Sequence, residues 1–150
     1  MSSCKKCNSS TCKTYQQTSG YRERPSYVFY QRAYRIASDA AKKGIVTEGS
    51  KALKMTLLHL WEHQEGRCFY TGKSMSLTGW PAPDAATVDR LVPARGYVRG
   101  NVVLCRSLVN RSKQDMVFRD FVLFCREILE NEERVTQVLE TLEQLTNFEN

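Results

Sequence analysis

Apolar residues recur at helical spacing in two segments of the first third of the chain. Residues 27–43 place them near one face, and Gly44 follows as a residue suited to ending a helix. Residues 51–64 show the same spacing, with Ser50 before them as a candidate N-cap and Gly66 after them. The pattern therefore predicts two amphipathic helices, one over each segment.

From Gly66 onward the pattern changes to short apolar runs separated by glycine and proline. Ala86–Val92 is predicted to be one strand, and Asn101–Cys105 is predicted to be its hairpin partner. The connection over residues 93–100 is too long for a tight turn and is expected to be a surface loop. A helix over residues 106–113 is expected to follow.

The last segment, from Asp115 to about Leu145, is predicted to be helical because an apolar stripe runs along its whole length. Its first half is expected to pack on the core, whereas its second half has few neighbours to bury it. The stripe would be buried if the second half folds back or pairs with another chain, and pairing would give a homodimer formed through this C-terminal helix. In a rival hypothesis, the acidic helix docks a different protein and the basic body is incidental.

Charge divides the chain into a basic and an acidic part. Residues 1–113 hold 19 Lys and Arg against 7 Asp and Glu, a net charge of +12. Residues 114–150 hold 3 Arg against 9 Asp and Glu, a net charge of −6. A basic block of this size is typical of a protein with a polyanionic partner, because phosphates that bind it release condensed counterions. The alternative is a basic surface with no particular partner.

No apolar run is long enough for a membrane span, and the N-terminus lacks a secretory signal, so we expect no membrane association and a cytoplasmic location with reduced thiols. A tight group of cysteines then favours metal over disulfides. Cys4, Cys7 and Cys12 form a zinc candidate, whose fourth ligand could be His63, Cys68 or a group of a second chain.

Four short motifs occur at consistent spacing between Gly66 and Lys113. They are Gly66-Arg-Cys-Phe-Tyr-Thr-Gly, Ala86-Thr-Val-Asp-Arg-Leu-Val, Gly96-Tyr-Val-Arg-Gly-Asn-Val-Val and Asn110-Arg-Ser-Lys. This stretch resembles the HNH (His-Me finger, ββα-metal) endonuclease family, in particular a phage and bacterial branch with an Asp-Arg pair. The resemblance implies an α+β fold, with a ββα-metal module flanked by N-terminal helices and a long C-terminal helical arm.

Composition, charge and the resemblance together divide the chain into three parts, and the resemblance implies a function. Residues 1–26 would be a basic, cysteine-containing arm, residues 27–129 an HNH-like nuclease domain with its core at 66–113, and residues 130–150 an acidic helical tail. The expected function is a metal-dependent DNA endonuclease or nickase. If the chain is phage-encoded, it would act in the cytoplasm of a bacterial host.

The resemblance also assigns the residues of the site. Asp89 and Asn110 correspond to the family's metal ligands, and Asn101 to the residue that holds the loop and helps to orient the base. Hard cations such as Mg²⁺, or Mn²⁺ in its place, prefer oxygen ligands of these types, and such an ion stabilises charge on the leaving oxygen of a phosphodiester.

The chain departs from the family at Arg90, which stands where the family has its general-base His. A guanidinium stays protonated, so Arg90 is expected to clamp the scissile phosphate instead of accepting a proton. Three alternatives follow: His63 or His59 acts as the base, metal-bound water reacts with help from the substrate phosphate, or the site binds DNA without cutting it. The last makes the chain a catalytically degenerate HNH module that acts as a DNA-binding or phage accessory protein.

Further residues are assigned to DNA contact or to packing. The phosphate contacts expected near the site are Arg95, Arg99, Arg106, Arg111 and Lys113. The outward side of the predicted helix 27–43 carries Arg32, Arg35, Lys42 and Lys43, and we interpret it as a phosphate-contacting face. Tyr97 either stacks on the substrate or packs on its own hairpin, and Trp80 is expected to plug a turn.

Overall fold

The computed structural model describes residues 23–147, and their side chains as far as residue 144. This part of the chain contains five α-helices and one two-stranded antiparallel sheet, which places it in the α+β class. The elements in order are α2 (Pro25–Lys42), α3 (Ser50–His63), β1 (Ala86–Arg90), the short 3-10 turn η2 (Pro93–Arg95), β2 (Val102–Arg106), α4 (Ser107–Lys113), α5 (Phe118–Glu130) and α6 (Glu132–Asn147).

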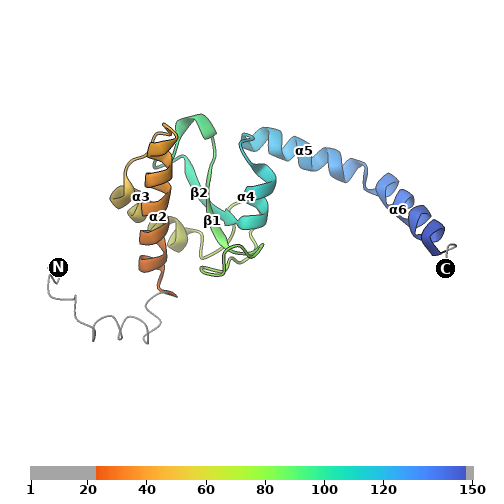
Figure 1. Cartoon of the computed structure of the whole chain (residues 1–150), viewed down its shortest axis with the longest axis horizontal. Coiled ribbons are helices and arrows are strands. Elements are labelled where there is room, and N and C mark those ends of the chain that lie inside the picture. Colours follow the sequence, from red (N-terminus) through yellow and green to blue (C-terminus); the bar gives the residue numbers. More distant parts are fainter. Residues whose placement is uncertain (1–22, 148–150) are drawn as a thin grey trace.

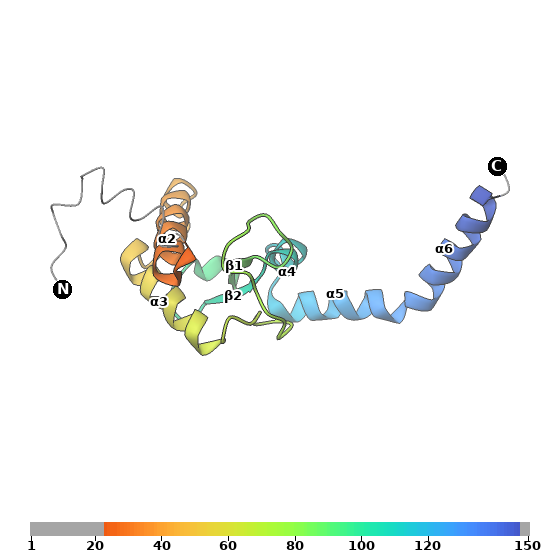
Figure 2. The same cartoon turned by 90° about the horizontal axis from the view of Figure 1, so that it is seen from below.

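Two helices and a hairpin form the body of the molecule. α2 and α3 pack against each other on one side of the β1–β2 hairpin, and α4 lies on the other side (Figures 1 and 2). The hairpin pairs Ala86 with Arg106 and Arg90 with Val102. Both predicted strands are therefore present, but β1 ends two residues before Val92 because the chain turns into η2 there.

The core lies between the two helices and the hairpin. It is made of buried residues from α2, α3 and both strands, among them Phe29, Leu53, Leu57 and Leu104. Cys68 and Cys105 belong to this core, as expected of lone cysteines with apolar neighbours. The expected N-cap of the second helix is wrong: Gly49 holds that position and Ser50 is the first helical residue, with no side-chain cap bond.

The link between α2 and α3 also fixes the hairpin loop. The amide of Tyr97 donates to the Val46 carbonyl (2.8 Å), and the amide of Glu48 donates to the Tyr97 carbonyl (3.2 Å). Gly96 lies so close that a Cβ there would come within 2.1 Å of the Val46 oxygen. Real Cβ atoms do not approach a backbone atom so closely, so a residue without a side chain is required at this crossing.

The C-terminal segment is helical as predicted, but it packs differently. α5 and α6 meet at Asn131 and extend away from the body (Figures 1 and 2). No residue of α5 is fully buried, so its first half does not pack on the core as expected. Contact with the body comes from the first turns, where the rings of Phe118 and Phe121 lie 5.6 and 6.3 Å from that of Tyr70. Within residues 23–147, no helix is long and apolar enough to cross a membrane.

Candidate functional site

β1 and α4 bring two predicted site residues onto facing surfaces. Thr87 and Asp89 are two apart on a strand and therefore share a face, and Asn110 and Lys113 are three apart on a helix and likewise share a face. The Asn110 side-chain amide donates to the Thr87 hydroxyl and to the Val88 carbonyl, both at 3.2 Å. Lys113 pairs with Asp89 one helical turn further on. The hairpin thus holds α4 through two neighbouring polar contacts.

Asp89 and Lys113 form a buried ion pair. The Lys113 ammonium lies 3.1 Å from Oδ2 and 3.3 Å from Oδ1 of Asp89, and the two residues are 0% and 4% exposed, respectively. The Tyr70 hydroxyl donates to the same carboxylate, and Lys113 also donates to the Arg90 carbonyl (3.1 Å). A charge at this depth is stable only when it is paired and hydrogen-bonded, which this network provides.

The network changes the acidity of Tyr70. Burial and the hydrogen bond to Asp89 raise the pKa of the Tyr70 phenol far above its ordinary value. The raised pKa favours the protonated phenol, which is the form that donates to the carboxylate. Sequence reasoning missed both Tyr70 and the role of Lys113. The one available signal was the three-residue spacing of Asn110 and Lys113, which puts both residues on the helix face that receives β1.

The residues expected to hold Mg²⁺ or Mn²⁺ do not fit that role as they are arranged here. The Lys113 ammonium donates to Oδ1 of Asp89 and lies 3.1 Å from Oδ2, which accepts from Tyr70. An ammonium therefore stands where a metal would need to neutralise the carboxylate. The side-chain nitrogen Nδ2 of Asn110 donates to β1, and no described group donates to its side-chain oxygen Oδ1. Within residues 23–147, no group of three or more His, Cys, Asp or Glu side chains is placed to hold a metal.

Arg90, the expected phosphate clamp, makes contacts within the protein. Its guanidinium donates to Asp115 (2.9 Å) and to the Pro93 carbonyl (3.1 Å), and it lies 5.1 Å from the centre of the Tyr97 ring. These contacts join β1, the hairpin loop and the segment before α5. Arg90 therefore serves here as a link between elements, and Tyr97 packs on its own hairpin, one of the two alternatives considered for it.

Asn101 holds the hairpin loop. Its fully buried side chain donates to the carbonyls of Val92 (3.0 Å) and Gly96 (2.7 Å) and accepts from the Val92 amide (3.1 Å). The loop-holding part of the expected role matches these contacts. Nothing in them connects Asn101 to a base, because all of its partners are backbone groups of the loop.

Neither candidate base makes a described hydrogen bond or ion pair with Asp89. His59 lines a pocket between α3 and β2 together with Arg99 and Val103, on the side of the hairpin opposite α4. The rings of His59 and His63 stack at 6.0 Å. The zinc candidates Cys4, Cys7 and Cys12 lie outside the described residues. Of the proposed fourth ligands, Cys68 is buried in the core, where its sulfur accepts from the Arg106 amide at 3.4 Å.

The expected phosphate contacts divide into three groups. Arg95, Arg99 and Arg111 are exposed, and no described carboxylate forms an ion pair with their guanidinium groups. Arg106 is half-buried, with an Nε that has no partner within the described part of the chain. Lys113 is fully buried against Asp89, so its assignment as a surface phosphate contact is wrong: a fixed buried ammonium does not reach a DNA backbone.

The β1–β2 hairpin and α4 are thus joined by the Asp89 carboxylate, whose charge Lys113 neutralises. Exposed arginines whose guanidinium groups form no described ion pair lie around them. Such an arrangement can attract and position an anionic polymer, because exposed guanidinium groups bind phosphate oxygens. In comparisons with known proteins, no family model, no curated protein and no solved structure matches this chain.

Proposed function

We propose that this chain is a nucleic-acid-binding protein built on an HNH-like ββα module that no longer depends on a metal. The observation that carries the proposal is the buried pair of Asp89 and Lys113. An ammonium held on both carboxylate oxygens supplies the positive charge that a divalent ion would otherwise supply. The module can therefore keep its shape, and present its surface to DNA, without an ion.

The distribution of charge supports binding. Residues 23–113, which form the body, hold 15 Lys and Arg against 7 Asp and Glu, a net charge of +8, whereas the acidic excess lies in the C-terminal arm. Arg95 and Arg99 lie in the hairpin loop and Arg111 in α4, all exposed, and their guanidinium groups form no ion pair with a described carboxylate. The backbone amide of Arg99 does donate to the Glu48 carboxylate (3.2 Å). Contacts of this type position a protein on the phosphate backbone without reading sequence.

A metal-dependent endonuclease or nickase is the second candidate. One observation favours it: Asp89 and Asn110 come from facing surfaces of β1 and α4, the two elements that the HNH resemblance assigns to the metal ligands. Hydrolysis would require Lys113 to leave the carboxylate. It would also require a base, since the guanidinium of Arg90 stays protonated. We place it second for these two reasons.

A plasmid assay separates the two candidates. Supercoiled plasmid is incubated with wild-type protein in EDTA, Mg²⁺ or Mn²⁺, and both its gel mobility and its nicking are followed. We expect a mobility shift in EDTA and no nicking with either metal. Nicking that needs a metal and disappears in Asp89→Asn and Asn110→Ala would establish the nuclease instead. A plasmid that neither shifts nor nicks would reject both candidates.

We also infer that the chain forms a homodimer through its C-terminal arm. The support is the row of large apolar side chains on α6 that stay about half exposed: Val135, Val138, Leu139 and Leu142. Such a row exceeds the scattered apolar residues of an ordinary surface and is typical of a contact face. The same face would serve the rival hypothesis of a different protein partner, which a measurement of mass distinguishes.

A further inference from the structure

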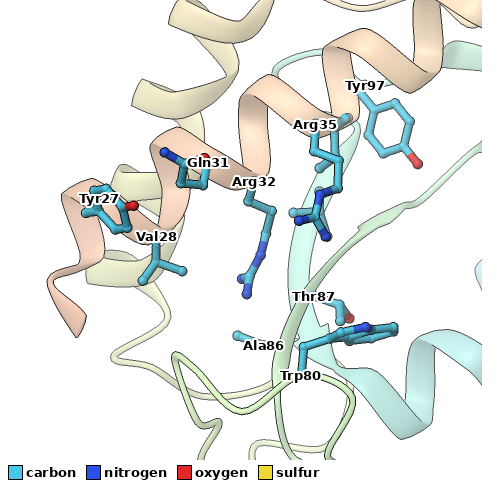
Figure 3. Close-up of a pocket in the computed structure, with 11 residues that line it drawn as sticks. Tyr27, Val28, Gln31, Arg32, Arg35, Trp80, Ala86, Thr87 and Tyr97 are labelled. Carbon is cyan, nitrogen blue, oxygen red and sulfur yellow. The ribbon is translucent and has the colours of Figure 1, made fainter. Parts of the chain in front are cut away.

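A cavity of about 380 Å³ lies between α2 and β1, where it is lined in part by Thr87, the strand residue that contacts Asn110. Figure 3 shows its walls: Arg32 and Arg35 extend from α2 toward β1, and the indole of Trp80 lies across from them beside Thr87. A volume in this range is typical of pockets that receive a small ligand or part of a larger one. Arg32 and Arg35 were expected to form part of a phosphate-contacting face, and no other role assigned so far uses this cavity.

One wall of the cavity carries positive charge that the protein leaves uncompensated. Nη1 of Arg32 is buried and has no hydrogen-bond partner among the described residues, and Nη2 reaches only the Leu77 carbonyl, at 3.4 Å. Burial, and then the charge of Arg35, lower the pKa of the Arg32 guanidinium. The residues that line the cavity include no Asp or Glu. A buried donor without a partner is costly, so this wall fits an anionic group that would accept from it.

The opposite wall carries an aromatic surface that is open to a ligand. Trp80 is 59% exposed, so the expectation that it plugs a turn is wrong. An indole favours burial or stacking, and a nucleobase is a planar group that stacks well on it. Trp80 and the two arginines therefore offer, across one cavity, a stacking surface and an anion site.

We infer that this cavity binds one unstacked nucleotide of a nucleic acid, with its phosphate at Arg32 and Arg35 and its base against Trp80. The inference rests on the proposed function and narrows its substrate class to single-stranded or bulged nucleic acid. A base inside a paired duplex is stacked on its neighbours and cannot enter a pocket unless it is extruded. A free mononucleotide offers the same chemistry, and the test below separates it from a polymer.

The test compares two labelled duplexes that differ by a single bulged thymidine, with binding followed by fluorescence anisotropy. Wild-type protein is expected to bind the bulged duplex about tenfold more tightly than the paired one, since stacking of one base is worth on this order. Trp80→Ala is expected to abolish the preference for the bulged duplex. Trp80→Phe is expected to keep about half of the difference in binding free energy between the two duplexes, because phenylalanine still stacks. Both variants change an exposed side chain and should fold.

The anion site is tested in the same assay. Arg35→Gln removes an exposed arginine of the cavity wall and is expected to reduce the preference for the bulged duplex about threefold. The control is Lys43→Gln, which removes the same charge at the exposed end of α2. It is expected to weaken binding of both duplexes equally and to leave the preference unchanged. Unlabelled thymidine monophosphate serves as the competitor that represents a free nucleotide.

The outcomes separate this inference from the proposed function. Binding of both duplexes with equal affinity, unchanged by Trp80→Ala, overturns the nucleotide pocket and leaves nucleic-acid binding in place. Binding of neither duplex overturns both. Displacement of the bulged duplex by micromolar thymidine monophosphate shows that the cavity takes free nucleotides, and it overturns the assignment to a polymer.

Discussion

At the scale of single residues, the contact between Lys113 and Asp89 has the largest energetic consequence. Removing one partner of a buried ion pair leaves the other charge uncompensated, which typically costs about 3–5 kcal/mol. We therefore expect Lys113→Met to lower the free energy of unfolding by about 3 kcal/mol or more, measured by urea denaturation. Arg111→Met is the matched control, because Arg111 is exposed on the same helix and its loss should cost less than about 0.5 kcal/mol.

The same network permits a second variant that tests its cause. In Asp89→Asn combined with Lys113→Met, neither charge remains, so much of the lost stability should return. If Lys113→Met is as stable as the wild type, or the double variant is no better than the single one, the buried pair is not what holds α4 to the hairpin.

Tyr70 gives a pH-dependent prediction at this scale. Burial and the hydrogen bond to Asp89 raise the pKa of the Tyr70 phenol in the folded state. The stabilisation that Tyr70 gives the folded protein is therefore complete below the pKa of the unfolded state, about 10, and falls as the pH rises beyond that value. In the folded protein, wild type and Tyr70→Phe should give the same phenolate absorbance up to about pH 11. They should differ by one phenolate after denaturation. A difference already present in the folded state would contradict the assigned bond.

A role that depends on nearby residues is the easiest to anticipate, as the resemblance did for Asn101. Asn101, at the end of the loop, was expected to hold that loop, and its contacts are with residues close to it in the chain. Lys113 and Trp80 were misjudged because their surroundings come from distant segments. Whether a lysine is buried depends on the carboxylate brought opposite it, here 24 residues away in the chain, and the charge pattern of one helix does not show this.

At the scale of elements, the crossing of the hairpin loop with the α2–α3 link determines how the two halves of the body meet. Gly96 and Gly100 both have positive φ, at 74° and 78°, but only Gly96 faces a backbone atom that a Cβ would strike. Gly100→Ala should cost only the conformational strain, about 1–2 kcal/mol. Gly96→Ala should cost about 2 kcal/mol more, since the loop or the link must also move.

Thermal unfolding of the two variants measures this difference. Equal melting temperatures for Gly96→Ala and Gly100→Ala would mean that the loop and the link do not meet as described. The substitution and the sign of φ are the same at both positions, whereas a Cβ would meet the Val46 oxygen at Gly96 and no atom within 4 Å at Gly100.

The existence and order of the elements were predictable from periodicity, since both strands and all the helical segments occur where expected. Their exact ends were not. β1 stops at Arg90 because a 3-10 turn begins at Pro93, and the C-terminal helical segment breaks at Asn131. Such ends are decided by a few local hydrogen bonds, which compete with a periodic pattern that continues past them.

At the scale of the whole molecule, the C-terminal arm leaves a row of large apolar side chains of α6 about half exposed. If two arms pair, light scattering coupled to size-exclusion chromatography should give twice the monomer mass. Leu139→Glu should restore the monomer, because it places a charge in the apolar row of α6. Gln137→Glu adds the same charge at an exposed polar position and should stay dimeric. A wild-type protein that is monomeric at tens of micromolar would contradict the homodimer.

The central claim is that the body binds nucleic acid through its arginines without a metal. Fluorescence anisotropy with a labelled duplex, in EDTA and at increasing salt, tests it most directly. We expect binding in EDTA, with the logarithm of the binding constant decreasing linearly with the logarithm of the salt concentration. Each of the variants Arg95→Gln, Arg99→Gln and Arg111→Gln that removes a phosphate contact should make this slope less steep by about 0.9. Binding that appears only when Mg²⁺ is added, or no binding at low salt, would contradict the account.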